Sequence, residues 1–472
     1  MYFNSLDFAL FLLIVFILYW FVFKNKLKSQ NIVLLISSYV FYSFWDWRFL
    51  SLILISTLAD YFIGKALSKT NAQNHRKQLL YSSILLNLGL LCFFKYYNFF
   101  IDSFTTAFSF FGQTISVNSL NIILPVGISF YTFQTLSYTI DVYRKKIEPS
   151  NNLINFAAFV SFFPQLVAGP IERAAHLLPQ FSIKKQFTFV NGRAGLRQIL
   201  WGLFKKIVIA DQCAKYVDVI FNNADDYSGS TLFLGAVLFS FQIYGDFSGY
   251  SDIAIGTARL FGFNLKQNFA FPYFSKNIKV FWSRWHISLT TWFRDYLYIP
   301  LGGNRKSKLI TLRNIFIVFV VSGFWHGANW TFIIWGIVHA IFFIPYYFSN
   351  KKTAIKNNKY KALGLNIVKT LFTFTLVTLA WVFFRADTIT QALEYLNGVL
   401  SLSLFSIPEI RPKYLFFTFL FFIVIEWLGR NKQYAIEDLS IKWYTRYLFY
   451  YAITILILME SGNSQSFIYF QF

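Results

Sequence analysis

One histidine stands out as a residue that could do chemistry. His326 lies in the run Val320–Trp330, between two long apolar stretches, with Gly323 and Gly327 close to it on either side. An ionisable side chain at membrane depth is costly and is usually retained for a function. Burial disfavours the imidazolium, so we expect His326 to be neutral and able to accept a proton. The window alone fits equally well a structural histidine whose ring bonds a carbonyl on a neighbouring helix.

A second histidine, His286, lies in the aromatic and basic segment Phe281–Leu289. Trp282, Arg284 and Trp285 in the same segment are also typical of an amphipathic stretch at a membrane surface. That interpretation explains the aromatic and basic residues, but it gives no reason for the histidine that directly follows Trp285. Paired histidines therefore remain the strongest candidates for proton transfer.

The composition predicts that both histidines belong to an integral membrane protein. The chain has 472 residues, of which 56% are hydrophobic, 22% aromatic and 14% charged, with 61 Phe and 13 Trp. A soluble domain normally carries about 25% charged residues. Aromatic residues collect on lipid-facing surfaces and at both membrane interfaces. We therefore expect the lipid bilayer to be the principal surroundings of this chain.

The formal net charge of +22 could suggest a nucleic-acid ligand. The cations, however, form short clusters between apolar runs, which is typical of membrane topology and of binding to anionic headgroups. We therefore expect no nucleic-acid partner. The two cysteines, Cys92 and Cys213, offer no disulfide framework and no metal-ligand spacing, and no phosphate-binding or dinucleotide motif is present.

About twelve apolar runs are candidates for spanning a membrane, and we expect ten to twelve spans. Basic clusters such as Lys24–Lys28 and Arg144–Lys146 alternate with segments free of Lys and Arg, 103–119 and 217–231. This alternation predicts that the basic clusters face the cytoplasm and that the N-terminus lies outside. The runs lie at about 6–23, 31–44, 49–66, 80–101, 120–140, 196–214, 231–256, 313–325, 330–348, 364–384, 414–428 and 446–460.

Two segments predict interrupted helices. Asn155–Pro170 is apolar but contains Pro164 and Gly169, and basic loops flank it on both sides, so a re-entrant hairpin is the natural interpretation. Leu124–Gly127 similarly marks a broken helix. Broken helices also line sites in transporters, so a polysaccharide or ion transporter is one alternative to an enzyme. A non-catalytic scaffold of a polysaccharide export complex is another.

The chain resembles the bacterial membrane-bound O-acyltransferases (MBOAT), in the branch of the alginate O-acetylation protein and, more distantly, of the D-alanine transfer protein of lipoteichoic acid. The resemblance covers nearly the whole chain, with its motifs between about 125 and 385, and both histidine blocks match. The matching blocks are PVGISFYTFQ at 125–134, FFPQLVAGPI at 162–171, DFSGYSD at 246–252, WSRWH at 282–286, WHGANW at 325–330 and WVFFR at 381–385.

The resemblance implies one integral-membrane domain over residues 1–472, a helical bundle with re-entrant segments around a narrow tunnel. His326 matches the catalytic histidine of the family and His286 the second one. The implied reaction moves an acyl group, usually acetyl in this branch, from a cytoplasmic thioester to a hydroxyl of an exported polysaccharide or cell-wall polymer. His326 would act as general base, while His286 would hold the donor carbonyl or relay a proton.

The resemblance also implies the surroundings of this reaction. The donor would be acetyl-CoA or a carrier-protein thioester, with no bound cofactor and no metal, and the enzyme would lie in the bacterial cytoplasmic membrane. An extracytoplasmic SGNH-type transferase would be the partner. Of the other histidines, we expect His75 and His176 to be solvated and leave His339 as a further candidate. The residues expected to shape and polarise the tunnel are Trp282, Arg284, Trp285, Trp325, Asn329, Asp246, Ser248 and Gln165.

Overall fold

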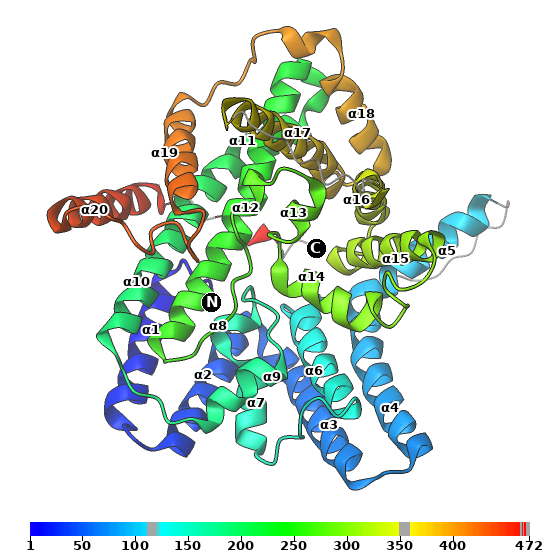
Figure 1. Ribbon diagram of the computed structural model, residues 1–472, viewed down its shortest axis with the longest axis vertical. Coiled ribbons are helices and arrows are strands. Elements are labelled where there is room, and N and C mark those ends of the chain that lie inside the picture. The colour runs from blue at the N-terminus through cyan, green and yellow to red at the C-terminus, as the bar shows by residue number, and fades with distance from the viewer. Residues whose placement is uncertain (111–119, 121, 349–358, 463–464, 466, 469–472) are drawn as a thin grey trace. The chain divides into compact units, whose positions relative to one another are not determined.

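The computed structural model describes residues 1–110, 120, 122–348, 359–462, 465 and 467–468, and the regular elements within these ranges are all helices (Figure 1). The all-α class predicted from the sequence is therefore confirmed. The described chain divides into two compact units, residues 1–196 with 254–266 and residues 197–253 with 267–472. Two of the three unit boundaries fall inside helices, α10 (Phe189–Leu203) and α12 (Gly229–Leu260), and the third, between 266 and 267, falls in an irregular segment.

The first unit is built from long apolar helices followed by several short ones. Its elements are α1 (Leu6–Ile17), η1 (Leu18–Val22), α2 (Leu27–Asp46), η2 (Trp47–Phe49), α3 (Leu50–Lys69), α4 (Gln73–Leu91), η3 (Cys92–Tyr96), α5 (Tyr97–Phe110), α6 (Ile128–Tyr143), α7 (Leu153–Ser161), α8 (Phe163–Leu166), α9 (Ala174–Leu177) and η4 (Leu178–Ser182).

A buried carboxylate ties three helices of this unit together. Asp60 on α3 is fully buried and accepts hydrogen bonds from Ser83 and Asn87 on α4 and from Thr139 on α6. The Asn87 amide lies 2.8 Å and the Thr139 hydroxyl 2.9 Å from the carboxylate. A buried carboxylate is tolerated when such donors surround it. Hydrophobicity therefore predicts α3, α4 and α6 from the sequence. The alignment of these three helices along one another depends on the polar contacts of Asp60.

The two predicted interruptions are real breaks in the helical path. Between α7 and α8 the chain leaves the helical conformation at Phe162, and the freed N–H of Phe163 donates to the Ser38 hydroxyl of α2 at 3.0 Å. At the other interruption α6 begins at Ile128, after Gly127 with φ +73°. A Cβ on Gly127 would meet the Leu166 carbonyl at 2.7 Å, so glycine is required there for both its backbone and its size.

The second unit contains both histidine blocks. Its elements are η5 (Phe204–Ala210), α11 (Asp211–Asn222), η6 (Ala224–Asp226), most of α12, η7 (Pro272–Phe274), α13 (Ile278–Trp282), α14 (Ile287–Phe293), η8 (Arg294–Tyr298), α15 (Lys308–His326), α16 (Trp330–Phe348), α17 (Lys359–Arg385), α18 (Ile389–Val399), η9 (Leu402–Phe405), α19 (Lys413–Gly429) and α20 (Trp443–Glu460).

Glycines bring α15 and α16 together as a tight hairpin. A Cβ on Gly323 would lie 2.2 Å from the Phe332 carbonyl, and a Cβ on Gly336 would lie 2.3 Å from the Phe319 carbonyl. Small residues at membrane helix interfaces allow this kind of backbone approach. The glycine before His326 therefore serves helix packing, and it fixes the end of α15 that carries this histidine.

Six helical segments of the described chain are long and apolar enough to cross a membrane. They are 27–69, 73–109, 229–260, 308–326, 330–347 and 364–385. The sequence predicts ten to twelve spans, and it separates 31–44 from 49–66. These two runs lie in the distinct helices α2 and α3, with extended backbone at Asp46 between them, although 27–69 counts as one of the six segments. The predicted run 414–428 corresponds to α19, which has 17 residues and is not one of the six segments. A multi-pass membrane protein is confirmed.

Candidate active site

His286 is held in an unusual backbone conformation at the start of α14. It has φ +43° and ψ +56°, a left-handed conformation that non-glycine residues rarely adopt. His286 is 1% exposed, and its ring stands nearly perpendicular to that of Phe247, with centroids 4.7 Å apart. Strained backbone of this kind persists when the surroundings over-determine it, and it clusters at functional sites. The conformation therefore singles out His286 within its short helical segment.

A hydrogen bond with Asn268 fixes the protonation of His286. The Asn268 side-chain oxygen lies 3.1 Å from His286 Nδ1, and it also accepts from the backbone N–H of Ser288 at 3.2 Å and from the Ser288 hydroxyl at 2.9 Å. The Ser288 N–H can only donate, so the atom facing it is the oxygen of the amide. Nδ1 of His286 therefore carries the hydrogen, which leaves a lone pair on Nε2.

His286 is neutral across the ordinary pH range. It lies between α13 and α14, outside the six candidate spans, and burial lowers the pKa of its imidazole to about 3. The cause is the loss of hydration, which penalises the charged ring. A neutral ring whose Nε2 carries a lone pair can accept a hydrogen bond or a proton, whereas its Nδ1 hydrogen is committed to Asn268.

His326 is the last residue of α15 and is 3% exposed. Trp325 contacts both histidines: its ring centroid is 5.0 Å from that of His326 and 6.1 Å from that of His286. The carbonyl-rich end of a helix stabilises positive charge, so this position favours the imidazolium that forms when His326 takes up a proton. The two predicted histidines thus belong to one buried aromatic cluster.

The cluster continues from His326 into α16 and α17. Trp335 on α16 meets His326 edge-on with centroids 5.2 Å apart, and Phe384 on α17 lies 5.4 Å from His326. Trp335 also stacks on Trp381 of α17 at 5.5 Å and lies 4.9 Å from His339. The third histidine of the second unit is therefore linked to His326 through a single tryptophan ring.

Asp246 and Ser248 face a buried ion-pair cluster on the neighbouring η5 segment. Lys206 bridges Asp246 at 2.8 Å and Asp211 at 2.7 Å, while the Lys205 ammonium donates to the Ser248 hydroxyl at 2.9 Å. Phe247, between them in sequence, is the residue of this helix that contacts His286. Buried charges of this kind need such partners. Asp246 and Ser248 are thus in position to anchor α12, and Phe247 to support the histidine.

The other predicted residues of the second unit take separate places. Trp282 packs against Trp335 with centroids 5.7 Å apart, and Trp285 against Trp381 at 5.1 Å. Arg284 is half-buried, and its carbonyl accepts from the Ala270 N–H at 2.9 Å. Asn329 caps the start of α16 by accepting from the Thr331 N–H, and its amide donates to the Asp387 carbonyl at 2.8 Å. Trp282 and Trp285 join the histidine cluster, whereas Asn329 is engaged in a loop contact.

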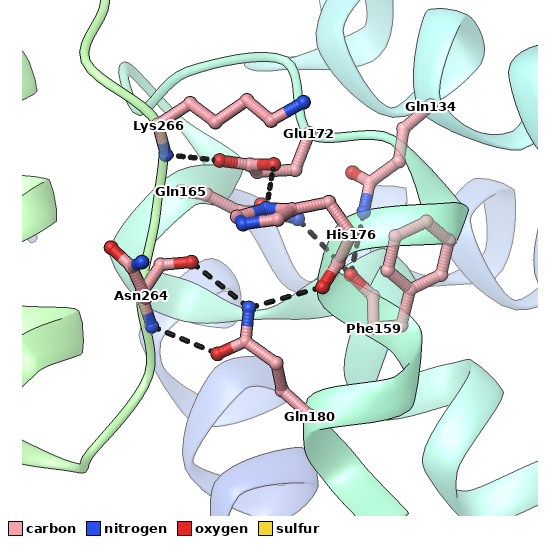
Figure 2. Close-up of polar contacts among 8 residues, drawn as sticks. All are labelled: Gln134, Phe159, Gln165, Glu172, His176, Gln180, Asn264 and Lys266. Atoms are coloured by element: carbon pink, nitrogen blue, oxygen red, sulfur yellow. Dashed lines mark hydrogen bonds and ion pairs between the residues drawn. The ribbon is translucent and has the colours of Figure 1, made fainter.

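Gln165 belongs to the first unit, where two amides converge on one carbonyl (Figure 2). The Gln134 amide donates to the Phe159 carbonyl at 2.6 Å and the Gln165 amide at 3.1 Å. Nearby, His176 is partly exposed, as predicted, and it also pairs with the buried Glu172 at 2.8 Å, a partner that the sequence does not predict. His75 is also exposed as predicted. In the described residues, the Gln165 amide therefore has a structural role: it donates to a carbonyl of α7 close to the break that follows this helix.

The arrangement can transfer a proton within an aromatic, low-dielectric site. His326 and His286 are both deeply buried, and their ring neighbours in the cluster are uncharged aromatic side chains. A neutral imidazole in such a site can act as a general base towards a hydroxyl. Among the described residues no group of three His, Cys, Asp or Glu side chains could hold a metal ion.

Comparison with known proteins identifies the class to which this helical membrane fold belongs. The model of the membrane-bound O-acyltransferase (MBOAT) family matches residues 144–384, which include both histidines. The chain belongs to the membrane-bound O-acyltransferase family. It is therefore a multi-pass membrane enzyme that transfers an acyl group to a hydroxyl.

Within this family, the chain is similar in sequence to several individual proteins. The chain is 40% identical over 392 residues to the probable alginate O-acetylase AlgI of Pseudomonas putida, covering 81% of this chain and 77% of that protein. It is 37% identical over 406 residues to the peptidoglycan O-acetyltransferase of Helicobacter pylori, covering 80% and 75%. It is 31% identical over 260 residues to the teichoic acid D-alanyltransferase of Bacillus subtilis, covering 52% and 64%.

Several residues of the cluster escape prediction from the sequence. Asn268 lies in an irregular segment with no motif of its own, so nothing in the sequence pairs it with His286. Trp335 lies four residues before His339, which the sequence already leaves as a candidate, on an apolar helix. This spacing puts the two on one face, and the signal could have added Trp335 to the predicted site. Trp381 and Phe384 lie in a block that carries the family resemblance but not among the predicted site residues.

Proposed function

We propose that this chain transfers an acetyl group from a cytoplasmic thioester to a hydroxyl for the O-acetylation of an exported polysaccharide or cell-wall polymer. The observation that carries the proposal is the convergence of His286 and His326, 40 positions apart in the sequence, on the ring of Trp325, which contacts both. The names of the relatives support the acetyl group and the polymer, because alginate and peptidoglycan are both polymers outside the cytoplasm.

In the proposed reaction His326 is the general base. The acceptor hydroxyl gives its proton to His326 while its oxygen attacks the thioester carbonyl, and the proton then passes from the imidazolium to the departing thiolate. The position of His326 at the carbonyl end of α15 supports this role, since positive charge is stabilised there. His286, with its lone pair directed by Asn268, receives a hydrogen bond from the acceptor or holds the donor in place.

The donor is proposed to be acetyl-CoA or an acetylated carrier protein, reaching the site from the cytoplasmic side of the bacterial inner membrane. Both carry phosphate, and the exposed residues Arg305, Lys306 and Lys308 offer cations that attract it. The immediate acceptor is proposed to be either the polymer or a serine of an extracytoplasmic SGNH-type transferase. No cofactor is needed for this transfer, because the thioester itself supplies the activated acyl group.

Replacing His326 by alanine in cells tests this proposal. Alanine cannot accept a proton, so we expect the acetyl content of the exported polymer to fall by about 10²-fold or more while the protein accumulates normally. His75→Ala, at an exposed position in a polar segment, is the matched control and should leave acetylation unchanged. Wild-type acetyl content in cells with a normally expressed His326→Ala protein would rule out the role of His326.

A further inference from the structure

His339 is a buried histidine to which the proposed reaction assigns no role. It lies in the middle of α16 and is 0% exposed. Neither of its ring nitrogens has a hydrogen-bond partner among the described residues. Leaving a buried polar atom unpaired destabilises the folded protein, and this ring leaves two. A phenylalanine would fill the same space without that cost, so the imidazole calls for an explanation.

Two tryptophans beside His339 share this property. The Trp282 and Trp335 rings lie 5.0 and 4.9 Å from the His339 ring, and 5.7 Å from one another. The indole N–H groups of both are buried, and no described residue accepts a hydrogen from either. Three adjacent rings from α13 and α16 therefore hold four polar atoms that the described protein does not satisfy. The edge-on contacts among them offer N–H groups no more than a weak aromatic acceptor.

The chemistry of this ring trio restricts what it can bind. Each tryptophan supplies one donor, and a neutral histidine supplies one donor and one acceptor. The other ring neighbours of His339 are Phe281, Phe319, Phe342 and Trp381, all uncharged. Such surroundings suit a neutral group with one strong acceptor oxygen and apolar substituents, and they disfavour a phosphate or a cation, which would lose its hydration without a countercharge.

We infer that His339, Trp282 and Trp335 form the donor set for the carbonyl oxygen of the acyl thioester. The inference rests on the proposed function, because it assumes that a thioester enters the cluster. Trp335 lies against both His326 and His339, so it forms a common wall between the general base and the donor set. Neutral N–H donors in a low-dielectric site stabilise the negative charge that develops on such an oxygen during attack.

The step balances without any further reactant. The acceptor oxygen forms a bond to the carbonyl carbon, its proton goes to His326, and negative charge moves to the carbonyl oxygen beside the donor set. When the intermediate collapses, the carbon–sulfur bond breaks, and the thiolate takes the proton from His326. His339 keeps its own proton throughout, so it acts by hydrogen bonding and not by acid–base exchange.

Infrared spectroscopy of a bound donor tests the inference directly. We use purified full-length protein with His326→Ala, which blocks turnover, and record the carbonyl stretch of [1-¹³C]acetyl-CoA against the unlabelled compound. We expect the stretch to lie at lower frequency than in the double variant His326→Ala/His339→Phe, because the hydrogen bonds weaken the C=O bond. Equal frequencies in the two proteins would overturn the inference.

Kinetics separate the donor role from packing. With His326 intact, His339→Phe should lower kcat by about 10²–10³-fold, the usual effect of removing one donor to an oxyanion, and should change KM for acetyl-CoA little. Phe342→Leu disturbs the same aromatic surroundings without removing a polar atom, and it should retain most of the wild-type kcat. An equal loss in both variants, or no loss in His339→Phe, would contradict the donor role. A wild-type protein that transfers no acetyl group would instead contradict the proposed function itself.

Discussion

At the scale of single residues, the site depends on how a neutral imidazole is prepared before substrate arrives. His286 combines a left-handed backbone, deep burial and a fixed tautomer, and each has a separate structural cause. Asn268 is the residue that selects the tautomer, because its oxygen is already oriented by the Ser288 N–H. Supporting residues of this kind hold a reactive group in one geometry and so reduce the reorganisation needed during reaction.

The tautomer can be tested at Asn268. Asn268→Leu removes the acceptor of His286 and Ser288, so we expect transfer to fall at least tenfold with little change in KM for the donor. Asn268→Asp keeps an acceptor oxygen but adds a negative charge, which favours the imidazolium of His286. Its pH–rate profile should therefore lose activity at the acidic end at a higher pH than the wild type does. Identical profiles for wild type and Asn268→Asp would contradict the contact.

His286 should also make stability depend on pH. Burial lowers the pKa of this histidine from 6.5 to about 3, so the unfolded chain binds its proton more readily than the folded protein. The folded state therefore loses stability from this residue as pH falls from about 6.5 towards 3, and gains nothing more above 6.5. Thermal unfolding of the detergent-purified protein between pH 5 and 7 measures this. His286→Gln should show a smaller decrease at low pH than the wild type, and an equal decrease would refute the assignment.

At the scale of elements, the hairpin of α15 and α16 positions two of the three histidines of the second unit. The close approach of the two helices depends on Gly323 and Gly336, each of which faces a carbonyl of the opposite helix. From the sequence, Gly323 near His326 predicts that another group comes close to the α15 backbone, but it does not identify that group. In the structure that group is the backbone of α16.

Alanine substitutions test the hairpin. A Cβ at either glycine would lie within 2.3 Å of a backbone carbonyl, a distance that requires the helices to separate. Gly323→Ala and Gly336→Ala should each destabilise the protein by about 1–3 kcal/mol, seen as a lower unfolding temperature and less folded protein. Gly364→Ala on α17 is the control, since its Cβ meets no atom within 4 Å and alanine is the better helix former. Equal unfolding temperatures in all three variants would show that the contact carries no stability.

The sequence predicts elements and motifs better than it predicts contacts between them. Helical content, the breaks near Phe162 and Gly127, and the two histidine blocks all follow from local patterns. The Asn268–His286 contact and the Trp335–His326 contact do not, because each joins a histidine block to a residue outside the matching blocks. Gln165 lies in a matching block, yet in the described residues its amide bonds the Phe159 carbonyl.

At the scale of the whole molecule, the proposed reaction needs access from both faces of the membrane. The sequence predicts this from the alternation of basic loops, with His286 nearer the cytoplasm and His326 nearer the outside. Ser283 is exposed beside His286, and Ala328 is partly exposed beside His326. Both positions are therefore suitable for a cysteine reporter.

Cysteine labelling tests this two-sided access. Ser283→Cys and Ala328→Cys are placed separately in a protein whose native cysteines, Cys92 and Cys213, have been replaced. We expect an impermeant thiol reagent to label Ala328→Cys from the outside of intact cells, and Ser283→Cys only in inverted membrane vesicles. Labelling of both positions from the same face would contradict the predicted topology.

Recruitment of the donor should depend on charge and salt. Arg305, Lys306 and Lys308 are exposed, and changing all three to Glu should raise KM for acetyl-CoA at low ionic strength and less so at high ionic strength, because salt screens the attraction. The matched control is Asp225 and Asp226 changed to Lys, in the segment predicted to face outward. Unchanged KM at low salt in the triple variant would exclude recruitment by this loop, and a loss independent of salt would point to misfolding.

The central claim is that His326 is the base for acyl transfer, and single-turnover transfer from radiolabelled acetyl-CoA tests it most directly. Purified wild-type protein and His326→Gln, in the same lipid and with the acceptor polymer supplied, are compared for the rate at which label reaches the polymer. Glutamine preserves polarity and approximate size but cannot take up a proton. We predict that His326→Gln binds acetyl-CoA as the wild type does and transfers the label about 10²–10⁴-fold more slowly. Transfer by His326→Gln at the wild-type rate would contradict the claim.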